Sequence, residues 1–436
     1  MNLALSEEQA MIRDSAAQVL AERSASAAVR HAIEQTAGRD EALWHTLASE
    51  LGWCALTVPE AADGAGLGAL ELVLLMEQMG RRLACVPYFG TVCLAATALA
   101  QCESEAAREW LSRIASGEAS ATLALHAAAG FDAKTASVYA TAGLDARSAS
   151  AHAAARFDAR TVSVYAEETA NGYRLSGTLA QVVDGASADL LLVPAAIANE
   201  AQTIALFGLN CADLAGLVRT PLVTLDATRP LARVELNAVD VPRHALLACG
   251  REAQRALLDT AWFAALALAA EQLGGAQQCL DLTLAYTAER VQFGRAIASF
   301  QAVKHRCAQM MVEIEAARSA VLGAAQAWDQ ARNRAGAPLS LDVLADIATA
   351  KATANDAFRF CAQEAIQLHG GVGFTWEYDP QLYFKRAQAC SAQFGTTAQM
   401  LSFIAEQVID RCEVSSTAAL QQPPVDNAQA VLAGVL

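Results

Sequence analysis

Hydrophobic periodicity changes twice along the chain, and this change constrains the fold more than any other feature of the sequence. From Ser6 to about Ala115, apolar residues recur every three or four positions, which predicts helices. Between about 118 and 248 the period falls to two, which predicts strands. From Glu252 to Cys412 the helical period returns. A helical region, a strand region and a second helical region therefore follow one another.

The strand region contains the segments that alternate between apolar and polar residues, at 160–168, 172–183, 188–195, 203–209, 217–223 and 231–241. No long helical pattern separates them, so we expect an antiparallel sheet or barrel. The expected class is α+β. Its predicted parts are an N-terminal helical domain (1–117), a central β-barrel domain (118–248), a C-terminal helical domain (249–412) and a tail (413–436).

Length and charge limit the classes of function. A chain of 436 residues is too long for one simple core, so two or three domains are expected. The formal net charge of −15 argues against binding to nucleic acid or to an anionic membrane surface. A local basic patch can still bind an anionic cofactor.

The cysteines and the N-terminus indicate the compartment. The 11 cysteines are scattered singly, without a CxxC pair or a metal-binding spacing, so we expect free thiols in a reducing cytoplasm and no metal site. The N-terminus lacks the cationic start and apolar block of a signal peptide. No uninterrupted apolar run reaches the roughly 18 residues of a membrane span. The predicted location is cytoplasmic.

Three successive 13-residue repeats stand at the entry to the strand region, within 131–169. They begin at Phe131, Leu144 and Phe157. This period is shorter than the common helical repeat units. A tandem duplication that extends a strand or a hairpin loop explains them; a binding role for the insert is the alternative.

Two polar, glycine-containing segments interrupt the second helical region. The first is "RVQFG", Arg290–Gly294, followed by Gln301; the second is "QLHGG", Gln367–Gly371. A guanidinium can donate two parallel hydrogen bonds to a phosphate, and glycine lets backbone N–H groups approach a ligand closely. Amide side chains both donate and accept hydrogen bonds. Together these residues suit a dinucleotide with its pyrophosphate, ribose and adenine.

In this order and spacing, the segments resemble the acyl-CoA dehydrogenase flavoprotein family. The resemblance runs from about Leu5 to Ala405, outside the repeats, and includes 51–60, 71–83, 173–177 and 226–242. It implies a helical N-terminal domain, a β-barrel and a C-terminal four-helix domain. It also implies an oligomer in which one subunit reaches FAD bound mainly by its neighbour. The implied cofactor contacts are Arg290, Gln292, Phe293, Gln301, Gln367, Leu368, His369, Gly370, Gly371 and Thr396.

The reaction implied by this resemblance is α,β-dehydrogenation of an acyl-CoA thioester. A carboxylate removes the α-proton while hydride leaves the β-carbon for the flavin, and an electron-transfer flavoprotein takes the electrons. The carboxylate needs a pKa near the working pH, which a partly apolar site can provide.

The expected carboxylate is missing from this sequence. Phe394 stands at its commonest place, before Gly395-Thr396, and no Asp or Glu occurs between Asp379 and Glu406. At the family's second place for the base stand Ala264 and, for the arginine that often follows, Ala265.

Glu271 is the candidate base that remains. It lies seven residues beyond Ala264 on the same helical face, within an apolar run. The alternative is a paired or interface residue, because buried glutamates usually have partners. Glu377 is a weaker candidate, since Lys385 and Arg386 would pair with it.

The strand region departs from the family as well. Its usual Thr-Glu-Pro and Gly-Ser-Asp motifs are absent, and Gln181 and Val183 replace its Trp and Thr. The groups for a subunit's own flavin are thus replaced, whereas those for a neighbour's flavin remain.

Three hypotheses follow from this contrast. The chain is a homo-oligomeric acyl-CoA dehydrogenase with a displaced base, a non-catalytic or half-site subunit that pairs with a base-bearing subunit, or a flavin monooxygenase or oxidase on the same fold. Fold alone does not separate them.

Overall fold

The computed structural model describes residues 4–125, 162–198, 203–212, 214–332 and 339–406. The first two 13-residue repeats, the first five residues of the third (157–161) and the C-terminal tail lie outside these residues.

The N-terminal region is helical, as the sequence predicts. Ser6 caps the first helix, where its hydroxyl accepts a hydrogen bond from the Gln9 N–H at 3.2 Å. The α-helices of this region are α1 (Glu7–Arg23), α2 (Ser26–Gln35), α3 (Glu41–His45), α4 (Ala69–Arg82), α5 (Thr97–Leu99) and α6 (Glu105–Ala115). A π-helical stretch, η4 (Phe89–Ala96), leads into α5.

A mixed sheet follows. Its strands are β1 (Ala121–Leu123), β2 (Val164–Thr169), β3 (Gly172–Val183), β4 (Leu190–Ile197), β5 (Ile204–Asn210), β6 (Leu217–Pro221), β7 (Leu231–Pro242) and β8 (Leu246–Cys249). The path runs β6-β7-β3-β2-β4-β5-β8, and β1 pairs with β4.

All six predicted strand segments are present, and their pairing adds detail to the expected barrel. Most neighbours are antiparallel, but β2 and β1 each pair with β4 in parallel. The path given by these pairs is a mixed sheet that ends at β6 and β8, rather than a purely antiparallel barrel.

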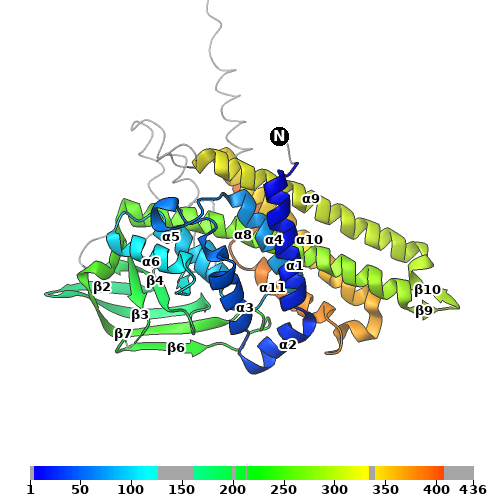
Figure 1. Cartoon of the computed structure of the whole chain (residues 1–436), viewed down its shortest axis with the longest axis horizontal. Coiled ribbons are helices and arrows are strands. Elements are labelled where there is room, and N and C mark those ends of the chain that lie inside the picture. Colours follow the sequence, from blue (N-terminus) through cyan, green and yellow to red (C-terminus); the bar gives the residue numbers. More distant parts are fainter. Residues whose placement is uncertain (1–3, 126–161, 199–202, 213, 333–338, 407–436) are drawn as a thin grey trace, which may run out of the picture.

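Three long helices extend away from the sheet (Figure 1): α8 (Arg251–Glu289), α9 (Gln301–Arg332) and α10 (Leu341–His369). Two shorter helices follow them in the chain, α11 (Pro380–Ser391) and α12 (Thr397–Ile404). A hairpin, β9 (Val291–Gln292) and β10 (Arg295–Ala296), joins α8 to α9 at the end far from the sheet (Figure 1).

Helix α8 crosses α4 at very short range. A Cβ on Gly80 would lie 1.9 Å from the Glu271 carbonyl oxygen, and one on Gly274 would lie 1.8 Å from that of Glu77. Only glycine permits this approach, and the crossing fixes Glu271 against the N-terminal domain.

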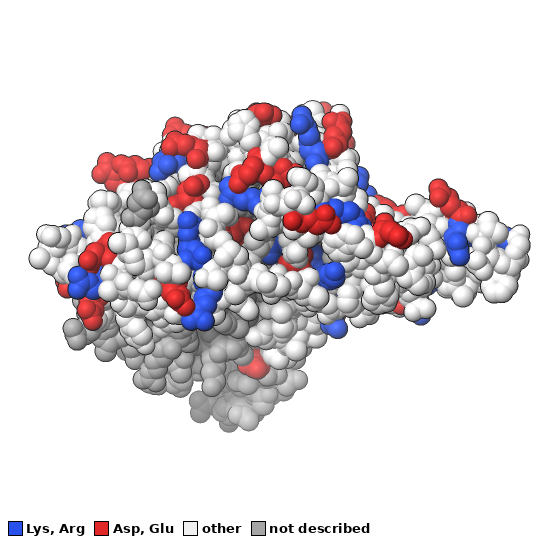
Figure 2. All heavy atoms as spheres, turned by 90° about the horizontal axis from the view of Figure 1, so that it is seen from below, with Lys and Arg blue, Asp and Glu red and all other residues white. Residues whose placement is uncertain are grey.

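Helix α8 is long and apolar enough to cross a membrane, although its sequence is not an uninterrupted apolar run. The apolar window of α8 is 100% buried within the fold, so α8 is here a core helix. On the face shown in Figure 2, acidic and basic side chains are interspersed over the described surface.

Candidate functional site

A buried ion-pair network surrounds Glu271 on α8. Arg386 of α11 donates to Glu271 Oε1 at 2.5 Å, and Arg229, which precedes β7, pairs with Oε2. Burial alone would raise the pKa of Glu271, but the two guanidinium groups outweigh it and hold the pKa below its usual value. The structure therefore supports the paired interpretation of Glu271. Its role as the base has no support from this geometry, because a carboxylate held by two cations is a poor proton acceptor.

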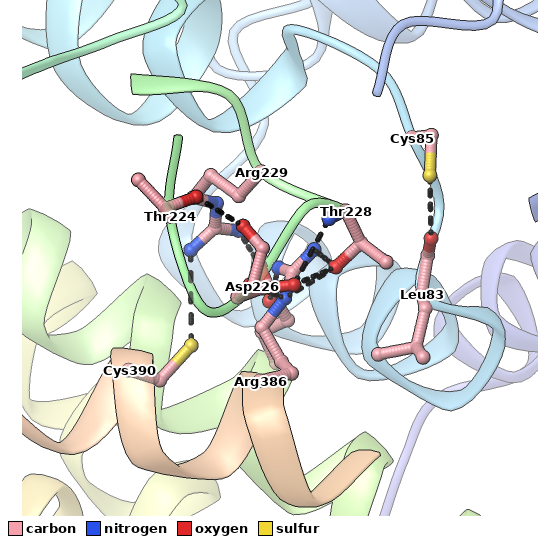
Figure 3. A network of polar contacts seen from close by, with 9 residues as sticks. Leu83, Cys85, Thr224, Asp226, Thr228, Arg229, Arg386 and Cys390 are labelled. Atoms are coloured by element: carbon pink, nitrogen blue, oxygen red, sulfur yellow. Dashed lines mark hydrogen bonds and ion pairs between the residues drawn. The ribbon is translucent and has the colours of Figure 1, made fainter. Parts of the chain in front are cut away.

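Arg386 connects this network to the segment before β7 (Figure 3). Its Nε lies 2.7 Å from Asp226 Oδ2, and Thr228 accepts from Nη2 at 2.5 Å. Burial lowers the pKa of Arg386, but Asp226 and Glu271 raise it further, so this cation stays charged. Arg386 thus pairs with Asp226 and Glu271 and not, as the sequence had suggested, with the exposed Glu377.

Phe394 closes the place where the family would carry its carboxylate. The side chain is 2% exposed, and its ring lies edge-on to Phe89 at 5.6 Å between centroids. The Arg229 guanidinium lies over the Phe89 ring at 4.6 Å. The second place for a base is closed too, because Ala264 and Ala265 are fully buried.

A fully buried lysine lies under the Phe394 loop, and the sequence analysis missed it. Lys351 Nζ donates to Asn355 Oδ1 at 2.6 Å, to Gln272 Oε1 at 3.1 Å and to the Cys390 carbonyl at 3.3 Å. Asn355 in turn donates to the Gly395 carbonyl at 3.1 Å. Burial lowers the pKa of Lys351 from 10.5 to about 7. A Lys and an Asn four residues apart in an Ala-rich helix were the available signal.

Strand β3 carries the two replaced positions. Gln181 is exposed to solvent, whereas Val183 is buried. Asp184, directly after them, is also buried, and burial raises its pKa to about 6 despite nearby arginines. The predicted cofactor contact Thr396 caps α12, and its hydroxyl is bonded to Gln399 at 3.0 Å.

Most of the other predicted cofactor residues lie exposed at the far end of the long helices (Figure 1). This group contains Arg290, Gln292, Phe293, Gln301, Gln367, Gly370 and Gly371, with Leu368 partly buried. Phe293, at the tip of the β9–β10 hairpin, is 91% exposed. A Cβ on Gly294, Gly370 or Gly371 would meet nothing within 4 Å, so the space beside these backbones is open.

His369 differs from the rest of this group because its ring faces the protein interior. It is 5% exposed, stacks on Tyr286 at 4.3 Å, and its Nδ1 lies 2.6 Å from the Ala365 carbonyl. Burial lowers the pKa of His369. The ring of His369 is therefore packed inside the fold, directly before the glycine turn.

Comparison with known proteins agrees with this architecture. Residues 6–118 match the model of the acyl-CoA dehydrogenase N-terminal domain, and residues 255–409 match that of the C-terminal domain. Acyl-CoA dehydrogenase IpdE2 of Mycobacterium tuberculosis is 30% identical over 402 residues, which cover 92% of this chain and 98% of that protein. The chain belongs to the acyl-CoA dehydrogenase family.

Solved structures with the same fold include two whose names join two protein designations. The ChsE4-ChsE5 complex of Mycobacterium tuberculosis superposes with a TM-score of 0.75 at 26% identity and covers 97% of this chain and 100% of that chain. A steroid ACAD described as Tcur3481-Tcur3483 gives a TM-score of 0.74 at 28% identity and covers 93% of this chain and 99% of that chain.

Proposed function

We infer that this chain is a half-site subunit of a hetero-oligomeric, FAD-dependent acyl-CoA dehydrogenase. The reaction is α,β-dehydrogenation of an acyl-CoA thioester, with electrons passed to an electron-transfer flavoprotein. The subunit contributes the far end of its long helices to FAD that a second, base-bearing subunit holds and uses.

The observation that carries this proposal is the contrast between two regions of the fold, the one around Phe394 and Glu271 and the one at the far end of the long helices. Where a carboxylate is required, Phe394 is packed edge-on to Phe89 at 5.6 Å, and Glu271 is enclosed by two arginines. At the far end of the long helices, Arg290 is exposed, and the space beside the Gly294, Gly370 and Gly371 backbones is open. One half of a cofactor site is therefore closed and the other is accessible.

The accessible end fits the chemistry of FAD. Arg290 would hold the pyrophosphate through its guanidinium, and Gly370 and Gly371 would bring backbone N–H groups close to it. The amides of Gln292 and Gln301 provide donors and acceptors for ribose and adenine. When bound, FAD supplies the hydride acceptor.

The closed end does not fit the same group. Val183 and Phe394 offer no hydrogen bond from their side chains, and the Thr396 hydroxyl is already bonded to Gln399. The nearby cations Arg229 and Arg386 are committed to Glu271 and Asp226. Proton abstraction from the α-carbon consequently belongs to the partner subunit.

Relatives support a mixed assembly. One neighbour is a complex of ChsE4 with ChsE5, and the name of the steroid ACAD joins two designations, Tcur3481 and Tcur3483; both share the fold of this chain over more than nine-tenths of its length. The second name also suggests a bulky, steroid-like acyl group as substrate.

Isolation of the native complex through a tag on this chain tests the proposal. We expect a second acyl-CoA dehydrogenase chain to co-purify, one that carries Asp or Glu at the position of Phe394 or Ala264. Acyl-CoA should bleach the flavin of this complex, and replacing the partner's carboxylate by its amide should stop the bleaching. Recovery of an active homo-oligomer would refute the half-site assignment.

A further inference from the structure

The segment from Val372 to Asp379 connects the glycine turn to α11 and is held to the N-terminal domain. It begins in the 3-10 turn Gly370–Phe374 and is largely exposed, with Phe374 70% and Trp376 45% accessible. An exposed segment of this kind needs fixed points if the turn that precedes it is to keep one position.

Trp376 is the central fixed point. Arg30 of α2 donates to its carbonyl oxygen and lies over its ring at 5.1 Å. Lys385 of α11 lies 5.4 Å from the same ring. The indole Nε1 donates to Glu34 Oε1 at 3.1 Å. One tryptophan therefore combines two cation–π contacts with two hydrogen bonds.

Asp379, at the end of the segment, binds the same helix. Its Oδ1 lies 2.6 Å from Arg30 Nη2 and accepts from the Ser26 hydroxyl at 2.7 Å. Between these points Tyr378 lies edge-on to Tyr286 and His369, at 5.9 and 6.2 Å.

The contacts on α2 share one face of that helix. Ser26, Arg30 and Glu34 are four residues apart, so they form a single stripe. The buried residues Val29 and Ala32 fix the helix to the core of the N-terminal domain. The stripe is thus a rigid support that lies 342 to 346 residues away in sequence from the tryptophan it binds.

We propose that this stripe of α2 positions the glycine turn for FAD, with Arg30 as the positioning residue that joins Trp376 and Asp379. The proposal rests on the proposed function, because it assumes that Gly370 and Gly371 contact the cofactor. Arg30 acts only through the 370–379 segment and touches no reacting atom.

The test uses the flavin-containing complex isolated through a tag on this chain, whatever its composition. The variants are Arg30→Ala, Arg30→Lys, Asp379→Asn and Arg290→Ala, with the exposed Arg23 at the end of α1 changed to Ala as the matched control. Two quantities are measured: amide hydrogen exchange across 370–379, and the dissociation constant for FAD after removal and re-addition of the cofactor.

We expect Arg30→Ala to speed amide exchange across the segment and to weaken FAD binding roughly tenfold. The variant removes the charge-assisted hydrogen bonds of the guanidinium to the Trp376 carbonyl and to Asp379, and a cation–π contact with Trp376. Arg30→Lys should give an exchange rate and an FAD affinity between those of wild type and Arg30→Ala. Lysine keeps the positive charge but cannot donate to both acceptors in the planar geometry of a guanidinium. Arg23→Ala should match the wild type. Asp379→Asn removes the negative charge of the Arg30–Asp379 ion pair without altering α2. If Arg30→Ala fails to fold, Asp379→Asn should still show the faster exchange and the weaker FAD binding.

Unchanged FAD binding in both Arg30→Ala and Asp379→Asn, together with a loss in Arg290→Ala, would overturn the positioning role and leave the proposed function intact. Unchanged binding in Arg290→Ala would refute the cofactor grip itself, and the positioning role would fall with it.

Discussion

Replacing Lys351 with Met should remove a group that binds its proton less tightly in the folded chain than in the unfolded chain. In the folded chain the ammonium is 0% exposed, and burial lowers its pKa from 10.5 to about 7. In the unfolded chain the side chain returns to its ordinary pKa. Between these two values the unfolded state holds a proton that the folded state largely lacks.

The free energy of unfolding therefore rises with pH in this window, because the unfolded state binds more protons. From pH 7.0 to 8.5 the rise attributable to Lys351 is about 1.5 kcal/mol, from a limiting slope of about 1.4 kcal/mol per pH unit. Below pH 7 the contribution levels off, since both states are then protonated. Lys351→Met should lack this rise and should be relatively more stable at pH 7.0 than at 8.5.

Proton uptake on unfolding measures this difference without assuming a two-state transition. Each protein is unfolded in unbuffered urea with reductant in a pH-stat at pH 8.0. Wild type should take up about 0.9 proton per chain more than Lys351→Met. The cysteines are common to both proteins and cancel. Lys304→Met, at an exposed lysine on α9, is the control and should match the wild type. Equal uptake by wild type and Lys351→Met would refute the displaced pKa.

Three further predictions concern the cofactor grip, the ion-pair network and the helix crossing. Arg290→Ala should lose about 1.5–3 kcal/mol of FAD binding with an unchanged fold, measured by flavin retention and circular dichroism; unchanged retention would remove this role. Glu271→Gln should lower the free energy of unfolding by about 3–5 kcal/mol at pH 7, because it leaves the buried Arg229 guanidinium without its counter-charge and leaves Arg386 with Asp226 alone. This loss should shrink as pH falls through the lowered pKa of Glu271, and a variant as stable as wild type in urea unfolding would contradict the pairing. Gly274→Ala should destabilise by about 3 kcal/mol, since its Cβ would lie 1.8 Å from a carbonyl oxygen of α4, whereas Gly371→Ala, with open space around it, should not; equal thermal midpoints for these two variants would argue against the crossing.

The sequence predicted the order of helices and strands because periodicity is a local property. It did not reveal β1 and β8, which have three and four residues and are too short to show alternation. The parallel pairing of β2 with β4 was also hidden, since strand neighbours depend on the path of the whole chain.

In the candidate site, too, local features could be predicted from the sequence, whereas long-range contacts could not. The replacement of the carboxylate by Phe394 was visible in one motif. The partners of Glu271 were not, because Arg229 and Arg386 are 42 and 115 residues away in sequence. The inward orientation of His369 likewise depends on Tyr286 from another helix. Long-range pairing decided these roles, and no spacing in the sequence encodes it.

The ratio of FAD to protein chain tests the central claim most directly. It should be measured for this chain expressed alone and for the complex with its base-bearing partner. The half-site account predicts weak flavin binding and little acyl-CoA oxidation by the chain alone, and about one FAD per mixed dimer in the complex. A homo-oligomer of this chain that carries one FAD per chain and oxidises acyl-CoA unaided would contradict it.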